Sequence, residues 1–283
     1  GQTPGHSGPA GADYAARRIA AYQAFYEHMP LRAGVLTRAV AGLSQGAELR
    51  LYDSVRFGRL AALHLLDDRQ YRDRQACTPG DQYGGGVVDV AQCQSWNDPQ
   101  RTLLGAAQEQ WLDARLAEPG ATWNVIGQQT LFGRRDFAPG RRELFANDGW
   151  DGYPAARGRV QASLQRHGTA NPVILGGDVH QNWVGHVKAD YARPDSRALG
   201  VEFCGTSISS RAGTNEKLPQ RLAANPHFVF ADAERRGYGL VDFTPRGLTT
   251  TLRTVDDVTR EDTGISTLAR FAVQAGRPVI ESA

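Results

Sequence analysis

The chain has 283 residues, of which 41% are hydrophobic and 22% are charged. This composition is ordinary for a globular protein with a sizeable core, and it excludes disorder over the whole chain, which needs low hydrophobicity together with high net charge. The net charge of +2 argues against a dedicated nucleic-acid-binding module, and no apolar run approaches the roughly 20 residues that a membrane-spanning helix needs.

The first part of the chain predicts helices on either side of an apolar strand. Residues 1–11 are rich in Gly, Pro and Ser and predict a loose lead-in. Apolar residues then recur at roughly helical spacing until Pro30, which ends the pattern. In chain order we expect a helix over 13–29, one strand over 55–67, a long polar loop over 72–100 and an amphipathic helix over 103–116.

The second part predicts alternating strands and loops and then becomes rich in strands. The sequence Thr-Pro-Arg-Gly at 244–247 predicts a hairpin turn between two apolar runs. No internal repeat and no clean linker is found, so residues 12–283 predict a single domain. We expect strands over 123–126, 172–175, 201–204, 239–243 and 248–255, a loop over 133–154 and a helix over 155–167 that Gly168 ends.

Three cysteines are too few for a disulfide framework. Cys77 and Cys93 flank a Gly-rich loop, and they either form one disulfide in an oxidising compartment or remain two thiols. Cys204 lies in the apolar run 201–204 and is predicted to be a small buried side chain.

The strongest local motif is GGDVHQNW at 176–183, directly after a short buried-type strand. Its glycines allow a sharp turn and close approach to a ligand. Asp178 offers a hard oxygen ligand and His180 a nitrogen ligand, a set that suits a transition metal beside harder cations. The alternative is that Asp178 caps a turn and His180 is a surface residue. Asn182 belongs to the same loop and is a candidate for shaping the site.

A second acidic motif, NDGWDGYP at 147–154, lies in the long loop before the third predicted helix. Asp148 and Asp151 make it a candidate for holding Ca²⁺ or Mg²⁺, which prefer oxygen ligands. The alternative is a turn cluster at the start of the helix, with Trp150 and Tyr153 packed as anchors.

Four more polar residues are candidates for the site. His186, six residues after His180, is either a third ligand or a structural residue. Arg69 either meets a phosphate or forms a salt bridge with Asp67 or Asp68. Gln128 and Gln129 either line a pocket or satisfy backbone groups.

The chain resembles the PhoD-like alkaline phosphatases, a branch of the metallophosphoesterases, and the resemblance covers nearly its whole length. The segments that carry it are AYQAFYEHMPLR (21–32), FGRLAALHLLDDRQYR (57–72), LLGAAQEQWL (103–112), TWNVIGQQTLF (122–132), DGWDGYPAAR (148–157), VILGGDVHQNW (173–183), ISS (208–210) and NPH (225–227).

The resemblance implies an α/β fold of the metallophosphoesterase type, a β-sandwich core with helices on both outer faces. It implies iron(III) and calcium as cofactors and phosphomonoesters or phosphodiesters as substrates, usually outside the cytoplasm, in the periplasm or secreted. By motif, Asp178 and His180 match the family's late metal-binding pair and Asp148 an acidic residue that faces calcium. Trp150 and Asp151 would help to shape that loop.

The chain departs from the family pattern at its start, since the family's early metal ligands do not occur in it. We therefore expect it to be the C-terminal part of a phosphatase, inactive or nearly so alone, because two or three carboxylates and one histidine are too few for a multinuclear site. The alternative is a non-catalytic fragment or cation-binding remnant of the same fold. The sequence gives no oligomeric state.

Overall fold

The computed structural model describes residues 12–29, 50–78, 84–138, 140 and 142–283. The predicted lead-in over 1–11 lies outside these residues, and the single domain over 12–283 stays a prediction. Within the described part, no helix is long and apolar enough to cross a membrane.

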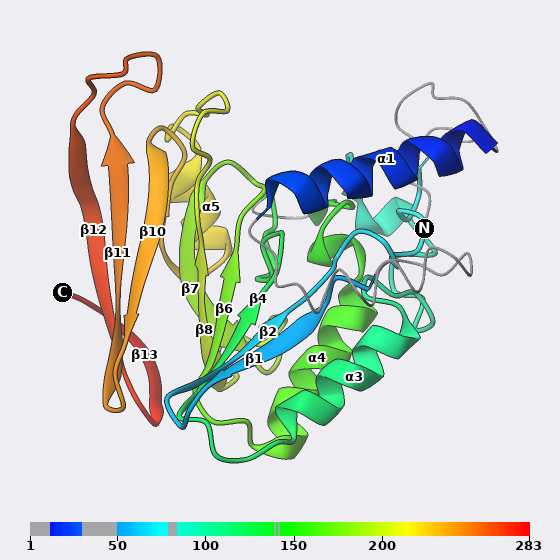
Figure 1. The fold of residues 1–283 in the computed structure, drawn as a ribbon, viewed down its shortest axis with the longest axis horizontal. Helices are drawn as coiled ribbons and strands as arrows, with labels where there is room; N and C mark the ends of the chain where they lie inside the picture. Colours follow the sequence, from blue (N-terminus) through cyan, green and yellow to red (C-terminus); the bar gives the residue numbers. More distant parts are fainter. Residues whose placement is uncertain (1–11, 30–49, 79–83, 139, 141) are drawn as a thin grey trace.

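A seven-stranded mixed sheet is the centre of the fold (Figure 1). Its strand order is β1-β2-β4-β6-β8-β7-β9, in which β2, β4, β6 and β8 run parallel and their neighbours at both edges run antiparallel. The parallel strands are apolar over most of their length, as expected for strands covered on both faces. The strands are β1 (Asp53–Phe57), β2 (Ala61–Leu65), β4 (Trp123–Gly127), β6 (Pro172–Gly176), β7 (Asn182–Lys188), β8 (Ala198–Cys204) and β9 (Phe228–Asp232).

A four-stranded antiparallel sheet of C-terminal strands is the second layer. Its hairpin between β10 and β11 pairs Phe243 with Leu248 across the predicted turn at 244–247, which is confirmed. The strands are β10 (Arg236–Phe243), β11 (Gly247–Val255), β12 (Ile265–Gln274) and β13 (Arg277–Ser282). The sequence pattern did not indicate β7, β9, β12 or β13, nor the short helix α5 (Leu218–Ala224).

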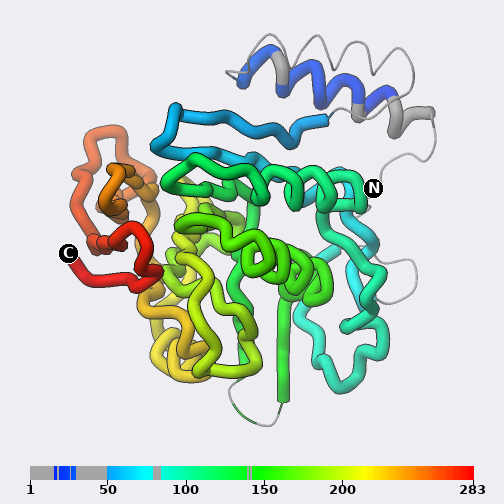
Figure 2. The backbone as a smooth tube through the Cα atoms, turned by 90° about the horizontal axis from the view of Figure 1, so that it is seen from below, coloured from blue at the N-terminus to red at the C-terminus, as the bar shows by residue number. Residues whose placement is uncertain are grey.

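The core lies on both faces of the seven-stranded sheet. One face packs on the second sheet through side chains such as Val125, Val173 and Phe271. The other face is covered by α3 (Ala106–Leu116) and α4 (Pro154–His167), which lie side by side in both Figure 1 and Figure 2. The β-sandwich flanked by helices is thus confirmed, but in the described part the helices cover one outer face of the sandwich rather than both.

The single strand predicted over 55–67 is wrong, because the chain turns back on itself within that run. β1 and β2 form a hairpin in which Phe57 pairs with Ala61. Gly58 lies in the turn with φ +55°, a conformation that glycine adopts without steric cost. The turn was hidden because apolar residues flank it on both sides.

The remaining predicted elements agree with the structure except at their boundaries. Helix α1 (Ala12–His28) and helix α4 are confirmed, and Gly168 ends α4 with φ +57°. Helix α3 begins at Ala106 rather than at residue 103, because Gly105 has φ +75° and breaks the helical pattern.

The two predicted loops contain short elements that pair with each other. Strand β3 (Val87–Asp89) from the first loop pairs with β5 (Leu144–Ala146) from the second, and a 3-10 turn, η1 (Val90–Gln92), follows β3. The first loop is not wholly outside the core, since Trp96 is buried. Cys77 and Cys93 form a disulfide, and Cys204 is a buried free thiol as predicted.

Candidate functional site

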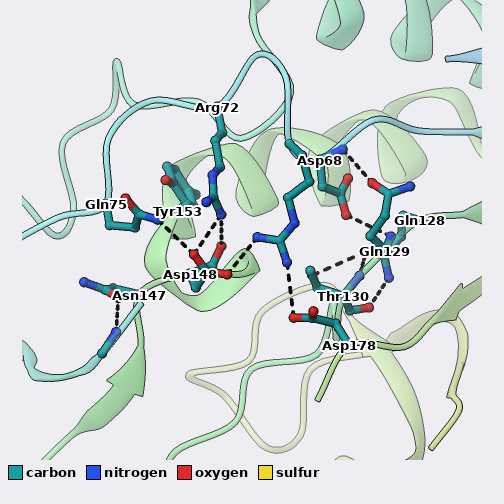
Figure 3. Close-up of polar contacts among 12 residues, drawn as sticks. Asp68, Arg72, Gln75, Gln128, Gln129, Thr130, Asn147, Asp148, Tyr153 and Asp178 are labelled. Atoms are coloured by element: carbon teal, nitrogen blue, oxygen red, sulfur yellow. Dashed lines mark hydrogen bonds and ion pairs between the residues drawn. The ribbon is translucent and has the colours of Figure 1, made fainter. Parts of the chain in front are cut away.

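Loops that follow three neighbouring parallel strands meet at one edge of the large sheet. Asp68 and Arg69 follow β2, Gln129 follows β4 and Asp178 follows β6. Because the carboxyl ends of parallel strands share an edge, this is the place where α/β sheets bind ligands. Asp68 N–H donates to Gln129 Oε1 (2.7 Å) and Gln129 N–H donates to Asp68 Oδ2 (3.0 Å), so the first two loops are joined (Figure 3).

The Arg69 guanidinium joins two carboxylates that are 30 positions apart in the sequence. Its Nη1 is 2.7 Å from Asp148 Oδ2 and its Nη2 is 3.2 Å from Asp178 Oδ2. Arg69 therefore forms salt bridges, as one alternative held, but with these two aspartates rather than with the predicted Asp67 or Asp68. The structure thus brings Asp148 and Asp178 to one place, although their role as metal ligands stays a prediction.

Asp148 accepts three further hydrogen bonds, from Arg72 and Gln75. Arg72 Nη1 donates to its Oδ1 and to its carbonyl oxygen, both at 2.9 Å, and Gln75 Nε2 donates to Oδ1 at 2.8 Å (Figure 3). Burial by itself would raise the pKa of Asp148, but the hydrogen bonds from Gln75 and Arg69 and the charge of Arg72 bring that pKa below its usual value. The carboxylate is therefore held in its ionised form.

The turn that carries Asp178 and His180 has a backbone that is unusual for these residues. Asp178 has φ +68° and His180 has φ +55°. Val179 N–H donates to the Gly177 carbonyl at 2.8 Å, so Asp178 is the central residue of a γ-turn with positive φ, which is rare and strained. Non-glycine residues with such a backbone concentrate at ligand-binding sites.

The carbonyl of His180, rather than its ring, anchors the turn to the rest of the fold. It accepts hydrogen bonds from Arg236 Nη1 (3.0 Å) and from the Thr206 hydroxyl (3.3 Å). Beneath the turn, the Cys204 thiol donates to the Gly177 carbonyl at 3.4 Å. The His180 side chain is exposed and has no partner among the described residues, so it is free to bind a ligand.

Asp68 is a buried carboxyl at this edge that the sequence reasoning did not single out as a site residue. Burial raises its pKa to about 7, despite the hydrogen bond from Gln129 N–H. Its Oδ1 has no hydrogen-bond partner within the described residues. Asp68 is therefore a buried carboxyl with a raised pKa beside Arg69.

The NDGWDGYP loop is anchored by its aromatic residues, as one of the two alternatives held. Trp150 and Tyr153 are fully buried, and Trp150 Nε1 donates to Gln128 Oε1 at 3.1 Å. Within the described residues, Asp151 has no hydrogen bond or ion pair with the cluster of Arg69, Asp148 and Asp178 (the Arg69 cluster) and instead forms a buried ion pair with Arg157 at 2.6 Å. Trp150 and Asp151 therefore shape the loop that presents Asp148.

Two other candidates lie apart from the Arg69 cluster. Asn182 is buried at the start of β7, where its Oδ1 accepts from Thr206 N–H at 3.1 Å and fixes the end of the Asp178 turn. His186 lies further along β7, and its Nε2 accepts from Ile280 N–H of the second sheet at 3.4 Å. His186 thus has a structural contact, and the direction of β7 carries it away from the edge.

Several residues of the site gave no separate signal in the sequence. Arg72, Gln75 and Arg236 contact Asp148 or His180 only through tertiary packing. Gln128 and Gln129 hydrogen-bond to backbone groups of Thr130 and of residues 66 and 68, which is the second of the two roles considered for them. Arg72 lies in the quoted segment 57–72, so its contribution could have been suspected from that resemblance.

Carboxylates and guanidinium groups alternate at this edge of the sheet. Two carboxylates converge on Arg69, and Arg72 adds a second guanidinium beside them. Carboxylate oxygens and a free imidazole are suitable donors for calcium and for iron. The residues fit such cations in part, since no group of three or more His, Cys, Asp or Glu side chains around one point is found in the described ranges.

Comparisons with known proteins agree with the resemblance seen in the sequence. A family model described as PhoD-like phosphatase matches residues 2–252. Alkaline phosphatase D of Bacillus subtilis (strain 168) is 38% identical over 261 residues, which are 91% of this chain and 42% of that protein. A solved structure of PhoD matches with a TM-score of 0.83 and 34% identity, over 99% of this chain and 51% of that one. The chain spans about half the length of these relatives.

Proposed function

Since this chain belongs to the PhoD-like phosphatase family, we propose that it forms part of the active site of a metal-dependent enzyme that hydrolyses phosphomonoesters, phosphodiesters or both. The observation that carries the proposal is the meeting of Asp148 and Asp178, from two separate loops, at the Arg69 guanidinium. Charged groups at the carboxyl edge of a parallel sheet suit the binding of a phosphate ester.

The proposed cations are iron(III) and calcium, as the family resemblance implies. Asp178, His180 and Asp148 would contribute to holding them, because two carboxylates and an exposed imidazole lie in the loops that converge there. When bound, such cations polarise the phosphoryl group and promote attack by an oxygen nucleophile. The described residues supply only part of a coordination shell, so further ligands are needed for a complete centre.

Arg69 is proposed to bind the phosphate group of the substrate. A guanidinium can donate two parallel hydrogen bonds to phosphate oxygens. Arg69 is about one-third exposed, so its donors are accessible from solvent while Asp148 orients them. Arg72 is nearly buried and adds positive charge without facing solvent, which favours an anionic ligand at this edge.

The proposed location is outside the cytoplasm, in the periplasm or the extracellular medium. Its support is the Cys77–Cys93 disulfide, since such bonds persist in oxidising compartments and are rare in the cytosol.

The alternative is a cation-binding protein with the same fold and no turnover. Both proposals use Asp178 and His180, so cation binding alone does not separate them. Hydrolysis does, because only the enzyme releases p-nitrophenol from p-nitrophenyl phosphate or bis-p-nitrophenyl phosphate.

The test is hydrolysis of both substrates at alkaline pH with Ca²⁺ and iron supplied, in the 283-residue chain and in a longer protein that contains it. We expect turnover in the longer protein that falls by about 10²-fold or more in Asp178→Asn and His180→Gln. Asp262→Asn, a matched substitution at an exposed residue between β11 and β12, should leave turnover unchanged. Turnover that survives both site substitutions would refute the ligand assignment, and cation binding without turnover would favour the alternative.

A further inference from the structure

The segment just before Cys77 holds the Asn147–Asp148 pair from one side. Gln75 Nε2 donates to Asp148 Oδ1 at 2.8 Å. Asn147 Nδ2 donates to the Ala76 carbonyl at 2.9 Å, and Asn147 itself is buried. Two consecutive residues that lead into Cys77 are thus bonded to the two consecutive residues that present the Asp148 carboxylate.

The segment that leads into Cys93 holds the same pair from the other side. Gly86 N–H donates to Asn147 Oδ1 at 2.7 Å, and Asn147 N–H donates to the Gly86 carbonyl at 3.0 Å. The backbone of Gly85 approaches Asp148 so closely that an added Cβ would lie 2.7 Å from Asp148 Cβ. Strand β3 then continues from this contact, pairs with β5 and leads through η1 to Cys93.

The noncovalent packing of these two segments is limited. Ala76, Cys93, Trp96 and Phe145 form a small buried cluster that is distinct from the clusters of the main sheets. Trp96 stacks on Phe145 with 6.0 Å between ring centroids. The Cys77–Cys93 bond is a covalent link inside this small cluster, with Cys93 buried and Cys77 exposed.

We propose that the Cys77–Cys93 disulfide is a positioning element for Asp148, and through Asp148 for the Arg69 guanidinium. It fixes the separation of the two segments between which Asn147 and Asp148 are clamped. The consequence for cation and phosphate binding rests on the proposed function, whereas the positioning of residues 144–150 does not.

A reductant in solution can reach the bond, because Cys77 is an exposed residue. A dithiothreitol thiolate attacks Cys77 Sγ and breaks the bond to Cys93 Sγ, which leaves as a thiolate and takes up a proton. The second dithiothreitol thiol then displaces Cys77 Sγ from the mixed disulfide. Dithiothreitol is oxidised to its cyclic disulfide and both cysteines end as thiols.

The first test is amide hydrogen exchange of the 283-residue chain, oxidised and after reduction. We expect exchange in 144–150 to become about tenfold faster on reduction, while exchange in β11 and β12 stays unchanged. Unchanged exchange in 144–150, or equal acceleration in β11 and β12, would overturn the proposal. A Cys77→Ala, Cys93→Val variant, which keeps the buried position apolar, should exchange as the reduced chain does and should not respond to dithiothreitol.

The second test asks whether the effect passes through Asp148. Calorimetry with Ca²⁺ alone should show about tenfold weaker binding after reduction, and no further weakening by reduction in Asp148→Asn. If reduction weakens Ca²⁺ binding equally in Asp148→Asn, the disulfide does not act through Asp148. If no form of the 283-residue chain binds Ca²⁺, its residues alone do not suffice for a cation site, and hydrogen exchange still decides whether the disulfide positions the loop.

Discussion

The carboxyl edge of the large sheet and the four-stranded C-terminal sheet satisfy their polar groups in different ways. Within the second sheet, side-chain hydrogen bonds between its own residues join near neighbours in the sequence, such as Thr244 to Gly247, three positions apart, and Thr254 to Ser266 across a hairpin. At the edge, Asp68 reaches Gln129 over 61 positions and Arg69 reaches Asp148 over 79. The second sheet is thus built from local contacts, whereas the candidate site exists only after distant loops have met.

The backbone shows the same contrast. Among the residues described in β10–β13 and their turns, positive φ is confined to glycines, Gly237 and Gly276. At the edge, Asp178 and His180 have positive φ although each carries a side chain. Of the four described non-glycine residues with positive φ, two thus lie in one short turn at the candidate site, and none lies in the second sheet.

The sharpest way to test this comparison is a matched pair of glycine substitutions. In Gly176→Ala, at the end of β6, the new Cβ would lie 2.0 Å from the Thr130 carbonyl oxygen, so we expect the free energy of unfolding to fall by about 4 kcal/mol. In Gly239→Ala, in β10, the nearest atom is Leu252 Cδ2 at 3.8 Å, and we expect the free energy of unfolding to rise by about 0.5–1 kcal/mol. Urea unfolding measures both, and similar losses would contradict the comparison.

A second prediction concerns Glu202, a buried titratable residue of β8. Burial raises the pKa of Glu202 in β8 to about 7, although the N–H groups of Phe132 and Gly133 bond its carboxylate. Between its unfolded pKa near 4.5 and pH 7, the unfolded chain has lost this proton and the folded chain keeps it. The free energy of unfolding therefore falls as pH rises through that window, by roughly 3 kcal/mol from this group.

Denaturant unfolding between pH 4.5 and 8 measures the slope of the free energy of unfolding against pH. The slope should become shallower in Glu202→Gln, while the part due to Asp68, whose pKa is also raised to about 7, should remain. Thr250 is a buried polar residue of the second sheet whose hydroxyl has no partner in the described part, and Thr250→Val should leave the slope unchanged. An unaltered slope in Glu202→Gln would show that folding does not raise the pKa of Glu202.

The smallest expected effect concerns the difference in stability between a glycine and an alanine variant at the same position. This difference should have opposite signs at the candidate site and in the second sheet. At Asp178, glycine should be more stable than alanine by about 1 kcal/mol, because alanine at φ +68° is strained. At Thr249, in the extended strand β11, glycine should be less stable than alanine by about 0.5–1 kcal/mol. Thermal unfolding of the four variants gives the two differences. The same sign at both positions would mean that Asp178 does not keep its left-handed backbone in solution.

The parts of the fold that could be predicted from the sequence are those with local signals. The turn at 244–247 and the end of α4 at Gly168 depend on a few adjacent residues, and both are confirmed. The β1–β2 hairpin was missed because its turn, residues 58–60, contains one glycine and no Pro, Asn or Asp. Residue patterns alone did not decide whether Cys77 and Cys93 form a disulfide, since that depends on where the chain brings the two residues.

The candidate site was predictable residue by residue but not as an arrangement. The motifs named Asp148, Asp178 and Arg69, since each follows an apolar run or lies in an acidic loop. The partners of Arg69 were sought in its immediate neighbours, whereas the structure gives it partners in two distant loops. Only the parallel order of β2, β4 and β6 brings these loops together, and that order has no signature in a single segment.

The pairing of β2 with β4 also has a consequence for the order in which the protein folds. Ala61 pairs with Trp123, so about sixty residues of chain must close before this pair of strands can form, whereas β10 and β11 meet across one short turn. Contacts that require long loop closure form more slowly than local ones. We therefore expect the C-terminal hairpins to form early during refolding, and the charged edge around Arg69 to assemble in the late, slow phase.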